Sequence, residues 1–427
     1  MKKLSDYAGR QWPADVLDNS IKGQVVAIPA VQDGICQRCG SRASEKLPSG
    51  QLYCRGCVGI GRLDAGQLLV RCPAQSGFPK SENGGLVWQG HLQPRQEEVS
   101  KALLAAYKER RDILVHAVTG AGKTEMIFPL LAAALAEGGR VCLATPRIDV
   151  VNELYPRLSA AFAVTIGKYH GREEKEAANE QLVLATTHQL LKFYQAFDLL
   201  IIDEVDSFPY AGSPQLHFAA KNAVKETGCR VFLTATPTSD LLAEVKKGNL
   251  AIVRLNRRFH GGLLPVPRLD FYVRPFLRGG RLHPKLARQI VKAVKAGHPL
   301  LVFVPRIAEI PAYLAAVKAI KDLGPVRLAG VHAQDPDRLE KVGAFRKGEL
   351  DLLLTTTILE RGVTFKHVWV IIIAADDAIY PPASLVQIAG RVGRDKDDQT
   401  GLVLFCYHKY TRAMREAIRQ IKEMNGK

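Results

Sequence analysis

The segment Ala117–Glu125, Ala-Val-Thr-Gly-Ala-Gly-Lys-Thr-Glu, constrains the fold of this chain more than any other stretch. It follows the apolar run Ile113–Val115 and precedes an apolar, helix-like stretch that begins at Met126. In a glycine turn between a strand and a helix, backbone N–H groups and the helix dipole converge on one point and attract an anion. The segment therefore predicts a P-loop, in which Lys123 contacts the β- and γ-phosphates of ATP and Thr124 holds Mg²⁺. The other residues that we expect to bind the nucleotide here are Thr119, Gly120, Ala121, Gly122 and Glu125.

Apolar strand-like segments alternate with helix-like segments around this loop, and each strand segment is apolar enough to be buried on both faces. This pattern is typical of an α/β fold with a doubly wound parallel sheet. Asp203 and Glu204 end a central strand segment, and such sheets place their chemistry at the carboxyl ends of strands. We expect Asp203 to hold Mg²⁺ and Glu204 to orient the attacking water. The predicted strands are 112–117, 140–146, 182–186, 199–203 and 230–236.

Four of the eight cysteines form two matched pairs. Cys36 and Cys39 are separated from Cys54 and Cys57 by residues 40–53, a hairpin-length spacer. Two such knuckles can close a tetrahedral thiolate site, and Zn²⁺ then supplies folding energy that a short segment cannot gain from a core. The pattern predicts a zinc site, which could also touch phosphates through nearby arginines or be a purely structural clip. A redox pair is the competing interpretation, and Cys72 is either a spare thiol or a substitute ligand.

The chain carries 59 Lys and Arg against 42 Asp and Glu, a formal net charge of +17. Such a field attracts polyanions and speeds association with nucleic acid or an anionic membrane surface. Solubilising surface charge is the alternative interpretation. No apolar run approaches the length of a membrane span, and no apolar segment follows the first lysines, so we expect a cytoplasmic protein without a transmembrane segment.

Seven short motifs occur in a fixed order between about residues 90 and 395, and they match the motifs of superfamily 2 helicases. The P-loop begins with alanine where the common pattern has glycine, a form typical of helicase-like motors. The four cysteines, the run 203–210 and the run 357–365 further resemble the ComFA family of late-competence proteins. These are cytosolic ATPases of DNA uptake in transformable bacteria. The motifs are Gln96, Ala117–Thr124, Thr145–Arg147, Asp203–Asp206, Thr234–Pro237, Thr355–Gly362 and Gln387–Arg394.

The resemblance implies two tandem RecA-like lobes and assigns further residues to ATP. The amide of Gln96 offers a donor and an acceptor and can match the adenine edge, and Gly362 belongs to the nucleotide site. The second lobe must supply a cation for phosphoryl transfer. The resemblance assigns Gln387, Arg391 and Arg394 to the γ-phosphate, with Arg394 as the arginine finger. We expect both arginines on one face of one helix; a solvated basic helix is the alternative.

In the ComFA family ATP hydrolysis is coupled to single-stranded DNA. We expect loops on the rim opposite the ATP site to hold successive phosphates without reading bases, although any of these residues could instead be a polar loop cap. Phe208 and Tyr210 flank a proline and would stack on bases, or else pack as cover for the core. The residues expected to contact phosphates are Arg147, Thr187, His188, Arg306 and Thr356.

The sequence thus predicts an arm over residues 1–30, a zinc-binding module over 31–78 and a linker over 79–90. The first lobe spans 91–255, and the second spans 256–427 with predicted strands at 300–304, 326–331, 352–355, 368–373 and 402–405. We expect the module and the lobes to have separate cores. Loss of zinc should then leave both lobes folded.

The function that we expect is an ATP-driven single-stranded DNA translocase, with ATP, Mg²⁺ and Zn²⁺ as cofactors. The alternatives are a replication-restart or repair DNA helicase, an RNA helicase, and a zinc-dependent nucleic-acid-binding adaptor with a switch-like ATPase. The expected partners are single-stranded DNA and other DNA-uptake proteins at the cytoplasmic face of the membrane, where the protein would be peripheral. A homo-oligomer is compatible with the sequence.

Overall fold

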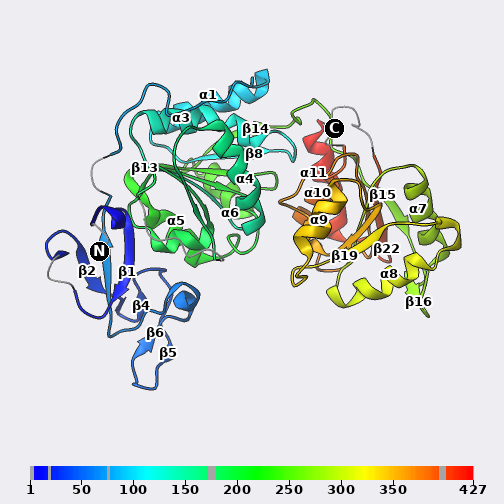
Figure 1. Cartoon of the computed structure of the whole chain (residues 1–427), viewed down its shortest axis with the longest axis horizontal. Coiled ribbons are helices and arrows are strands. Elements are labelled where there is room, and N and C mark those ends of the chain that lie inside the picture. Colours follow the sequence, from blue (N-terminus) through cyan, green and yellow to red (C-terminus); the bar gives the residue numbers. More distant parts are fainter. Residues whose placement is uncertain (1–3, 18–20, 75–76, 172–178, 394–400, 427) are drawn as a thin grey trace. The chain divides into compact units, whose positions relative to one another are not determined.

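The computed structural model describes residues 4–17, 21–74, 77–171, 179–393 and 401–426 (Figure 1). The chain divides into two compact units. The first comprises Met1–His116 and Lys123–Leu255, and the second comprises Ala117–Gly122 and Asn256–Lys427. Each unit contains a large β-sheet. Within the described ranges, no helix is both long enough and apolar enough to span a membrane.

The first unit holds a seven-stranded sheet in the order β10-β11-β9-β12-β13-β8-β14. Strand β9 pairs in parallel with β11 and β12, and β13 pairs in parallel with β12 and β8. Every residue of β9 and β11 is buried, which explains the continuous apolar runs in the sequence. The strands are β8 Ile113–Ala117, β9 Val141–Thr145, β10 Ile166–Tyr169, β11 Leu182–Thr186, β12 Phe197–Asp203, β13 Val224–Thr234 and β14 Ala251–Leu255. The helices are α1 Pro94–Lys108, α2 Lys123–Met126, α3 Phe128–Ala136, α4 Ile148–Ala161, α5 Pro214–Ala223 and α6 Ser239–Lys246, with the 3-10 helix η4 Thr187–Lys192.

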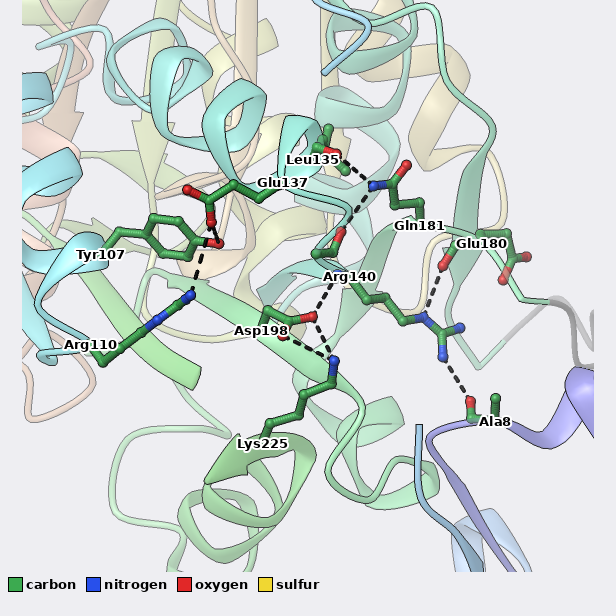
Figure 2. Close-up of polar contacts among 11 residues, drawn as sticks. Ala8, Tyr107, Arg110, Leu135, Glu137, Arg140, Glu180, Gln181, Asp198 and Lys225 are labelled. Atoms are coloured by element: carbon green, nitrogen blue, oxygen red, sulfur yellow. Dashed lines mark hydrogen bonds and ion pairs between the residues drawn. The ribbon is translucent and has the colours of Figure 1, made fainter. Parts of the chain in front are cut away.

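Polar contacts link the segments at the amino-terminal ends of the strands of this sheet (Figure 2). Asp198, near the start of β12, accepts from the Arg140 N–H at 2.8 Å and from Lys225 Nζ at 2.8 Å. The buried Arg140 guanidinium donates to the carbonyl oxygens of Glu180 at 2.9 Å and Ala8 at 2.8 Å. Burial lowers the pKa of Arg140 to about 10. The charged groups at this edge therefore hold neighbouring segments of the first unit together.

A three-stranded antiparallel sheet, in the order β1-β7-β2, is built from the first part of the chain. Strands β1 and β2 fall within residues 1–30, where we expect an arm, and both pair with β7. Arg10 of β1 is buried and donates to Tyr169 Oη at 2.8 Å, and its guanidinium lies 4.3 Å from the centre of the Phe193 ring. The segment is thereby anchored to the lobe. The elements of this region are η1 Leu4–Tyr7, β1 Arg10–Ala14, β2 Val26–Pro29, β3 Val31–Gln32, β4 Ile35–Cys36, β5 Glu45–Lys46, β6 Leu52–Tyr53, η3 Arg55–Ile60 and β7 Leu68–Cys72.

The cysteine segment shares its core with the first lobe. One buried cluster joins the four paired cysteines with Leu216 of α5 and with Val205. A Cβ atom at Gly40 would lie 2.8 Å from Cδ2 of Phe218, so the backbone there touches α5. The prediction of separate cores is therefore wrong, because so short a segment buries its cysteines only together with α5.

The second unit holds a six-stranded parallel sheet in the order β15-β22-β21-β18-β20-β19. The prediction of an α/β fold with two parallel-sheet lobes is confirmed. The strands are β15 Arg268–Phe271, β18 Leu300–Phe303, β19 Leu328–Val331, β20 Leu352–Thr355, β21 Trp369–Ile372 and β22 Val403–Tyr407, with the hairpin β16 Leu277–Arg278 and β17 Arg281–Leu282. The helices are α7 Pro284–Lys295, α8 Ile310–Lys318, α9 Arg338–Arg346, α10 Pro382–Ala389 and α11 Arg412–Met424, with the 3-10 helices η5 Ile307–Glu309, η6 Lys321–Leu323 and η7 Thr357–Leu359.

Candidate active site and cysteine cluster

The phosphate loop leaves β8 after Ala117 and reaches α2 at Lys123. Gly120 and Gly122 have φ angles of +82° and +72°, a left-handed conformation that favours glycine. Alternation between left-handed and other conformations turns successive N–H groups toward one concave side of a loop. The loop therefore has the backbone form that a phosphate cradle requires, with Lys123 as the first residue of the helix that follows.

The acidic pair lies at the carboxyl end of β12. Asp203 is the last residue of the strand, and Glu204 follows with a φ of +54°. The Glu204 N–H donates to Asp203 Oδ1 at 2.8 Å. A left-handed conformation of a residue other than glycine costs about 1–3 kcal/mol and is concentrated at functional sites. This turn holds the two carboxylates in a fixed relation at the edge where parallel sheets place their chemistry.

Asp206 connects this turn to the neighbouring strand. Its Oδ1 accepts from Thr234 Oγ1 at 2.7 Å, and its Oδ2 accepts from the Thr236 hydroxyl. The Thr236 N–H donates to Thr234 Oγ1 at 2.9 Å. Thr234 ends β13 and is fully buried. A movement of the loop after β13 would therefore reach the Glu204 turn through Asp206.

Two of the predicted nucleotide-binding residues make other contacts in this structure. Gln96 is buried, and its Oε1 accepts from the Gln93 N–H at 3.0 Å, which closes a capping box at the start of α1. The Glu125 carboxylate accepts from the Arg157 guanidinium of α4. The roles of Gln96 in adenine binding and of Glu125 in nucleotide binding stay predictions.

The second unit buries its predicted phosphate-binding residues. Gln387 lies in α10, and Arg391 follows that helix with 1% of its surface exposed. Arg391 Nε donates to the Glu360 carbonyl at 3.2 Å. Gly362, two residues further on, has a φ of +73°. The two motifs that the resemblance assigns to ATP in this lobe are thus in direct contact.

The expectation that Arg391 and Arg394 share a helix is wrong for Arg391. Helix α10 ends at Ala389, and Gly390 is its C-cap. The chain turns after this point, because Gly393 adopts a φ of +68°. Arg394, the predicted arginine finger, lies outside the described residues.

Arg258 holds the turn that carries Arg391, a role that the sequence motifs do not reveal. Its guanidinium is buried and donates to the carbonyl oxygens of Gly390 at 3.1 Å and Val392 at 2.6 Å, and also to that of Gly393. A cation at the end of a helix satisfies its last carbonyls and complements its dipole. Arg258 is therefore a positioning residue for this loop.

We expect Arg258→Met to lower kcat for ATP hydrolysis by about 10- to 100-fold, because a small misplacement of a catalytic group has an effect of this size. The KM for ATP should change little. Steady-state kinetics of the purified variant provide the measurement, and Arg257→Met is the matched control at the neighbouring position. Equal kcat values in the two variants would show that Arg258 does not position the loop that carries Arg391.

The loops predicted to hold DNA phosphates follow neighbouring strands of the first sheet. Arg147 follows β9, and Thr187 and His188 follow β11, its direct partner. Strand β9 also pairs with β12, so these loops and Asp203 lie along one edge. The prediction of opposite rims is therefore wrong, because parallel strands place all these loops at their common carboxyl edge. His188 is exposed, whereas Thr187 is fully buried and Arg147 lies 3.6 Å from Asp149.

In the second unit, the corresponding residues also follow paired strands. Arg306 comes after β18 and Thr356 comes after β20. The Arg306 side chain is 62% exposed and donates to Asp377 Oδ2 at 2.9 Å. Thr356 is 9% exposed and precedes η7. Both residues are thus at one edge of the second sheet, and their roles in DNA binding stay predictions.

The two aromatic residues after the acidic pair have different surroundings. Phe208 is 85% exposed. Tyr210 is 5% exposed, and its ring centre lies 4.7 Å from that of His217 in α5. Tyr210 also lines a cavity of about 360 Å³ between the loop, α5 and α6. A base can reach Phe208 but not the buried ring, so only Phe208 is suited to stacking in this structure.

The four paired cysteines come together. Their sulfur atoms lie within 4.8 Å of one another, and all four side chains are buried. The Cys36 and Cys57 sulfurs are 3.8 Å apart, and the Cys39 and Cys54 sulfurs are 3.4 Å apart. Four sulfurs at about 2.3 Å from a tetrahedral Zn²⁺ would be about 3.8 Å apart. The donor set therefore fits a structural zinc ion. Cys72 is not a member of this cluster.

Arg38 supports this fit by its charge. It is 1% exposed, and its Nε donates to Cys57 Sγ at 3.3 Å. A buried guanidinium needs a compensating negative charge, because burial of an isolated ion is costly. Four neutral thiols would not supply that charge, whereas thiolates on a metal would. No local pattern indicates this role, since Arg38 lies between Cys36 and Cys39 in an otherwise ordinary spacer.

Comparison with known proteins now identifies the family. Residues 93–245 match the DEAD/DEAH box helicase model, and residues 283–396 match the helicase conserved C-terminal domain model. The chain is 45% identical over 435 residues to competence protein ComFA of Streptococcus pneumoniae, covering 100% of this chain and 99% of that one. The chain belongs to the ComFA family. A second ComFA, from Bacillus subtilis, is 40% identical over 403 residues, covering 91% of this chain and 85% of that one.

Membership of the ComFA family confirms the resemblance drawn from the motifs. The protein is an ATP-hydrolysing, helicase-like enzyme of superfamily 2 in a family of competence proteins. Its fold is similar to that of the Mycobacterium smegmatis helicase Lhr bound to ssDNA and AMP-PNP, with a TM-score of 0.58 and 18% identity. That match covers 79% of this chain and 48% of Lhr. The helicase fold implies ATP with Mg²⁺, and the two sheets are RecA-like lobes.

Proposed function

We propose that this ComFA-family ATPase is a translocase on single-stranded DNA that powers DNA uptake in natural transformation. One observation carries the proposal. In the first lobe, the loops suited to DNA phosphates follow β9 and β11, and the acidic pair follows β12, which pairs with β9. Both kinds of loop therefore share one sheet edge. The competence proteins related to this chain and the ssDNA complex of Lhr support the same function.

We propose the following division of labour in ATP hydrolysis. Lys123 contacts the β- and γ-phosphates, and Glu204 orients the attacking water. Mg²⁺, held by Thr124 and Asp203, would neutralise negative charge on the phosphates. Arg391 and Arg394 would stabilise the γ-phosphate, with Gln387 beside them. The remaining nucleotide contacts are proposed for Gln96, Thr119, Gly120, Ala121, Gly122, Glu125 and Gly362.

We propose that the strand is sensed through the loop after β12. A base stacked on Phe208 would shift the segment that carries Glu204 and Asp206. Asp206 would transmit this shift to the end of β13, because its Oδ1 accepts a hydrogen bond from Thr234 Oγ1 at 2.7 Å. DNA binding would in this way change the position of the Glu204 carboxylate. Arg147, His188 and the backbone near Thr187 would contact phosphates in the first lobe, and Arg306 and the backbone near Thr356 would do so in the second.

We expect Phe208→Ala to raise the concentration of single-stranded DNA that half-saturates ATPase stimulation by about tenfold, since stacking is worth about 1–3 kcal/mol per base. ATPase titration with an oligothymidylate gives this value. Phe271→Ala is the matched control, because it removes an aromatic ring that is 51% exposed on the other unit. Unchanged half-saturation in Phe208→Ala would show that the ring does not contact the strand.

We also propose that Cys36, Cys39, Cys54 and Cys57 hold one Zn²⁺, which would supply folding energy to a segment without a core of its own. The protein would be cytoplasmic and act at the inner face of the membrane with other uptake proteins. The test of the function as a whole is steady-state ATPase with single-stranded DNA, duplex DNA and RNA in turn. A translocase on single-stranded DNA requires the largest stimulation by the first, and equal rates with all three would contradict the proposal.

A further inference from the structure

Strand β15 forms one edge of the second sheet, and its outer side has no neighbour among the described strands (Figure 1). Its inner side pairs in parallel with β22. The Tyr272 N–H donates to the Tyr407 carbonyl at 2.9 Å, directly after the strand. In a parallel pair, alternate residues direct both backbone groups to the same side. The backbone groups of Arg268, Asp270 and Tyr272 therefore face β22, and those of Leu269 and Phe271 face the other way, where Lys285 Nζ donates to the Phe271 carbonyl at 3.0 Å.

The side chains of this edge also alternate. Asp270 and Tyr272 are 7% and 2% exposed, and Lys285 lies 2.6 Å from Asp270. Leu269, Phe271 and Val273 are 38%, 51% and 84% exposed. An exposed apolar edge strand is a template for a further strand, and natural sheets usually cover or blunt such edges. Tyr410 is 44% exposed, and the Tyr407 ring links it to Phe271, with centre-to-centre distances of 6.1 Å to Tyr410 and 5.7 Å to Phe271. The apolar strip is Leu269, Phe271, Val273 and Tyr410.

The charge around the strip is strongly one-sided. Residues 268–295 contain eight basic side chains and a single acidic one, Asp270, which is buried and paired with Lys285. Arg268 and Arg274, at the two ends of the strip, are exposed. A second copy of this chain would bring the same positive charge to the edge, and like charges across paired strands are destabilising. The charge therefore favours an acidic partner over self-association.

We propose that the outer edge of β15 is a docking site for an extended, acidic segment of a partner protein, which adds a strand to the second sheet. Backbone hydrogen bonds to Leu269 and to the Phe271 N–H would supply affinity, as in other cases of strand addition. Apolar partner side chains would cover the strip, and flanking carboxylates would face Arg268 and Arg274. Nucleic acid is less suited to this edge. Phe271 and Tyr410 could stack on bases, but Leu269 and Val273 could not, and bases would leave the outward backbone groups without partners.

The test uses the full chain and a fluorescent ten-residue peptide in which valine and threonine alternate with glutamate. We expect saturable binding, observed by anisotropy and by amide shifts at residues 269–273. A peptide with lysine in place of glutamate should bind at least tenfold more weakly. N-methylation of alternate residues keeps the charge of the peptide but removes its backbone hydrogen bonds to the edge of β15. The same loss of affinity is therefore expected for the N-methylated peptide.

Two variants locate the site. Val273→Glu adds a negative charge that would repel the acidic peptide, at a residue that is 84% exposed, and Leu269→Pro removes an outward N–H without touching the ladder to β22. Each should weaken peptide binding at least tenfold, whereas Leu339→Glu, at an exposed residue of α9, should not. Melting temperatures and basal ATPase of Val273→Glu should match the parent chain. Equal peptide affinity in Val273→Glu and Leu339→Glu would overturn the proposal. So would loss of oligothymidylate or phosphatidylglycerol-vesicle binding in Val273→Glu without any peptide binding by the parent.

Discussion

Glu204→Gln should lower kcat for ATP hydrolysis by about 10³-fold while ATP still binds. The amide keeps the size and hydrogen-bonding reach of the side chain but lacks the negative charge that we propose orients and polarises the water. The Glu204 backbone, with a φ of +54°, and its N–H bond to Asp203 are compatible with glutamine. Single-turnover hydrolysis and equilibrium binding of labelled ATP measure the two properties separately.

Lys123→Ala provides the contrast. It removes the phosphate contact proposed for the first residue of α2, so both ATP binding and hydrolysis should be lost. The two variants together separate a binding role from a role in turnover. If Glu204→Gln lost ATP affinity as severely as Lys123→Ala, the water-orienting role of Glu204 would be untenable.

Cys54→Ser should release the proposed Zn²⁺ and destabilise the first lobe as well as the cysteine segment. The reason is the shared core, which joins the four cysteines to Leu216 of α5 and to Val205 beside the acidic pair. The expected loss is on the order of 3 kcal/mol, which lowers the melting temperature of a unit of this size by about 6–12 °C. Zinc analysis and calorimetry of the full chain measure both effects.

Cys72→Ser is the control for Cys54→Ser. Cys72 is also buried but is not a member of the sulfur cluster, so this variant should keep one zinc ion per chain. Full zinc content in Cys54→Ser would reassign a ligand. Metal loss in Cys54→Ser without any change in the melting of the first lobe would show that the contact between the segment and α5 contributes little.

Local patterns were sufficient to predict where the candidate site residues lie in the fold. The P-loop, the Asp203 and Glu204 pair and the paired cysteines each lie within a few residues of a strand end or a glycine turn. Their geometry depends mainly on the chain next to them. The parallel sheets could also be predicted from local sequence. Strands that are buried on both faces have continuous apolar runs, and these runs can be recognised without knowing which strands pair.

The features that sequence reasoning missed depend on contacts between distant segments. Arg258 caps a loop at residues 390–393, and nothing in its own Gly-, Pro- and Arg-rich surroundings indicates that target. Tyr210 and Phe208 are two residues apart and look alike in sequence, yet α5 covers only one of them. Arg391 fits a helix pattern, but Gly390 ends the helix before it. Tertiary packing decides all three cases.

In the function proposed above, ATP hydrolysis moves the protein along single-stranded DNA. The most direct measurement is the steady-state ATPase rate at saturating oligothymidylate, with the length of the oligonucleotide as the variable. A translocase spends more time hydrolysing ATP on a longer strand before it dissociates, so the rate should rise with length and then level off. A rate that is the same for all lengths long enough to bind, or that is not stimulated at all, would contradict translocation and favour an adaptor with a switch-like ATPase.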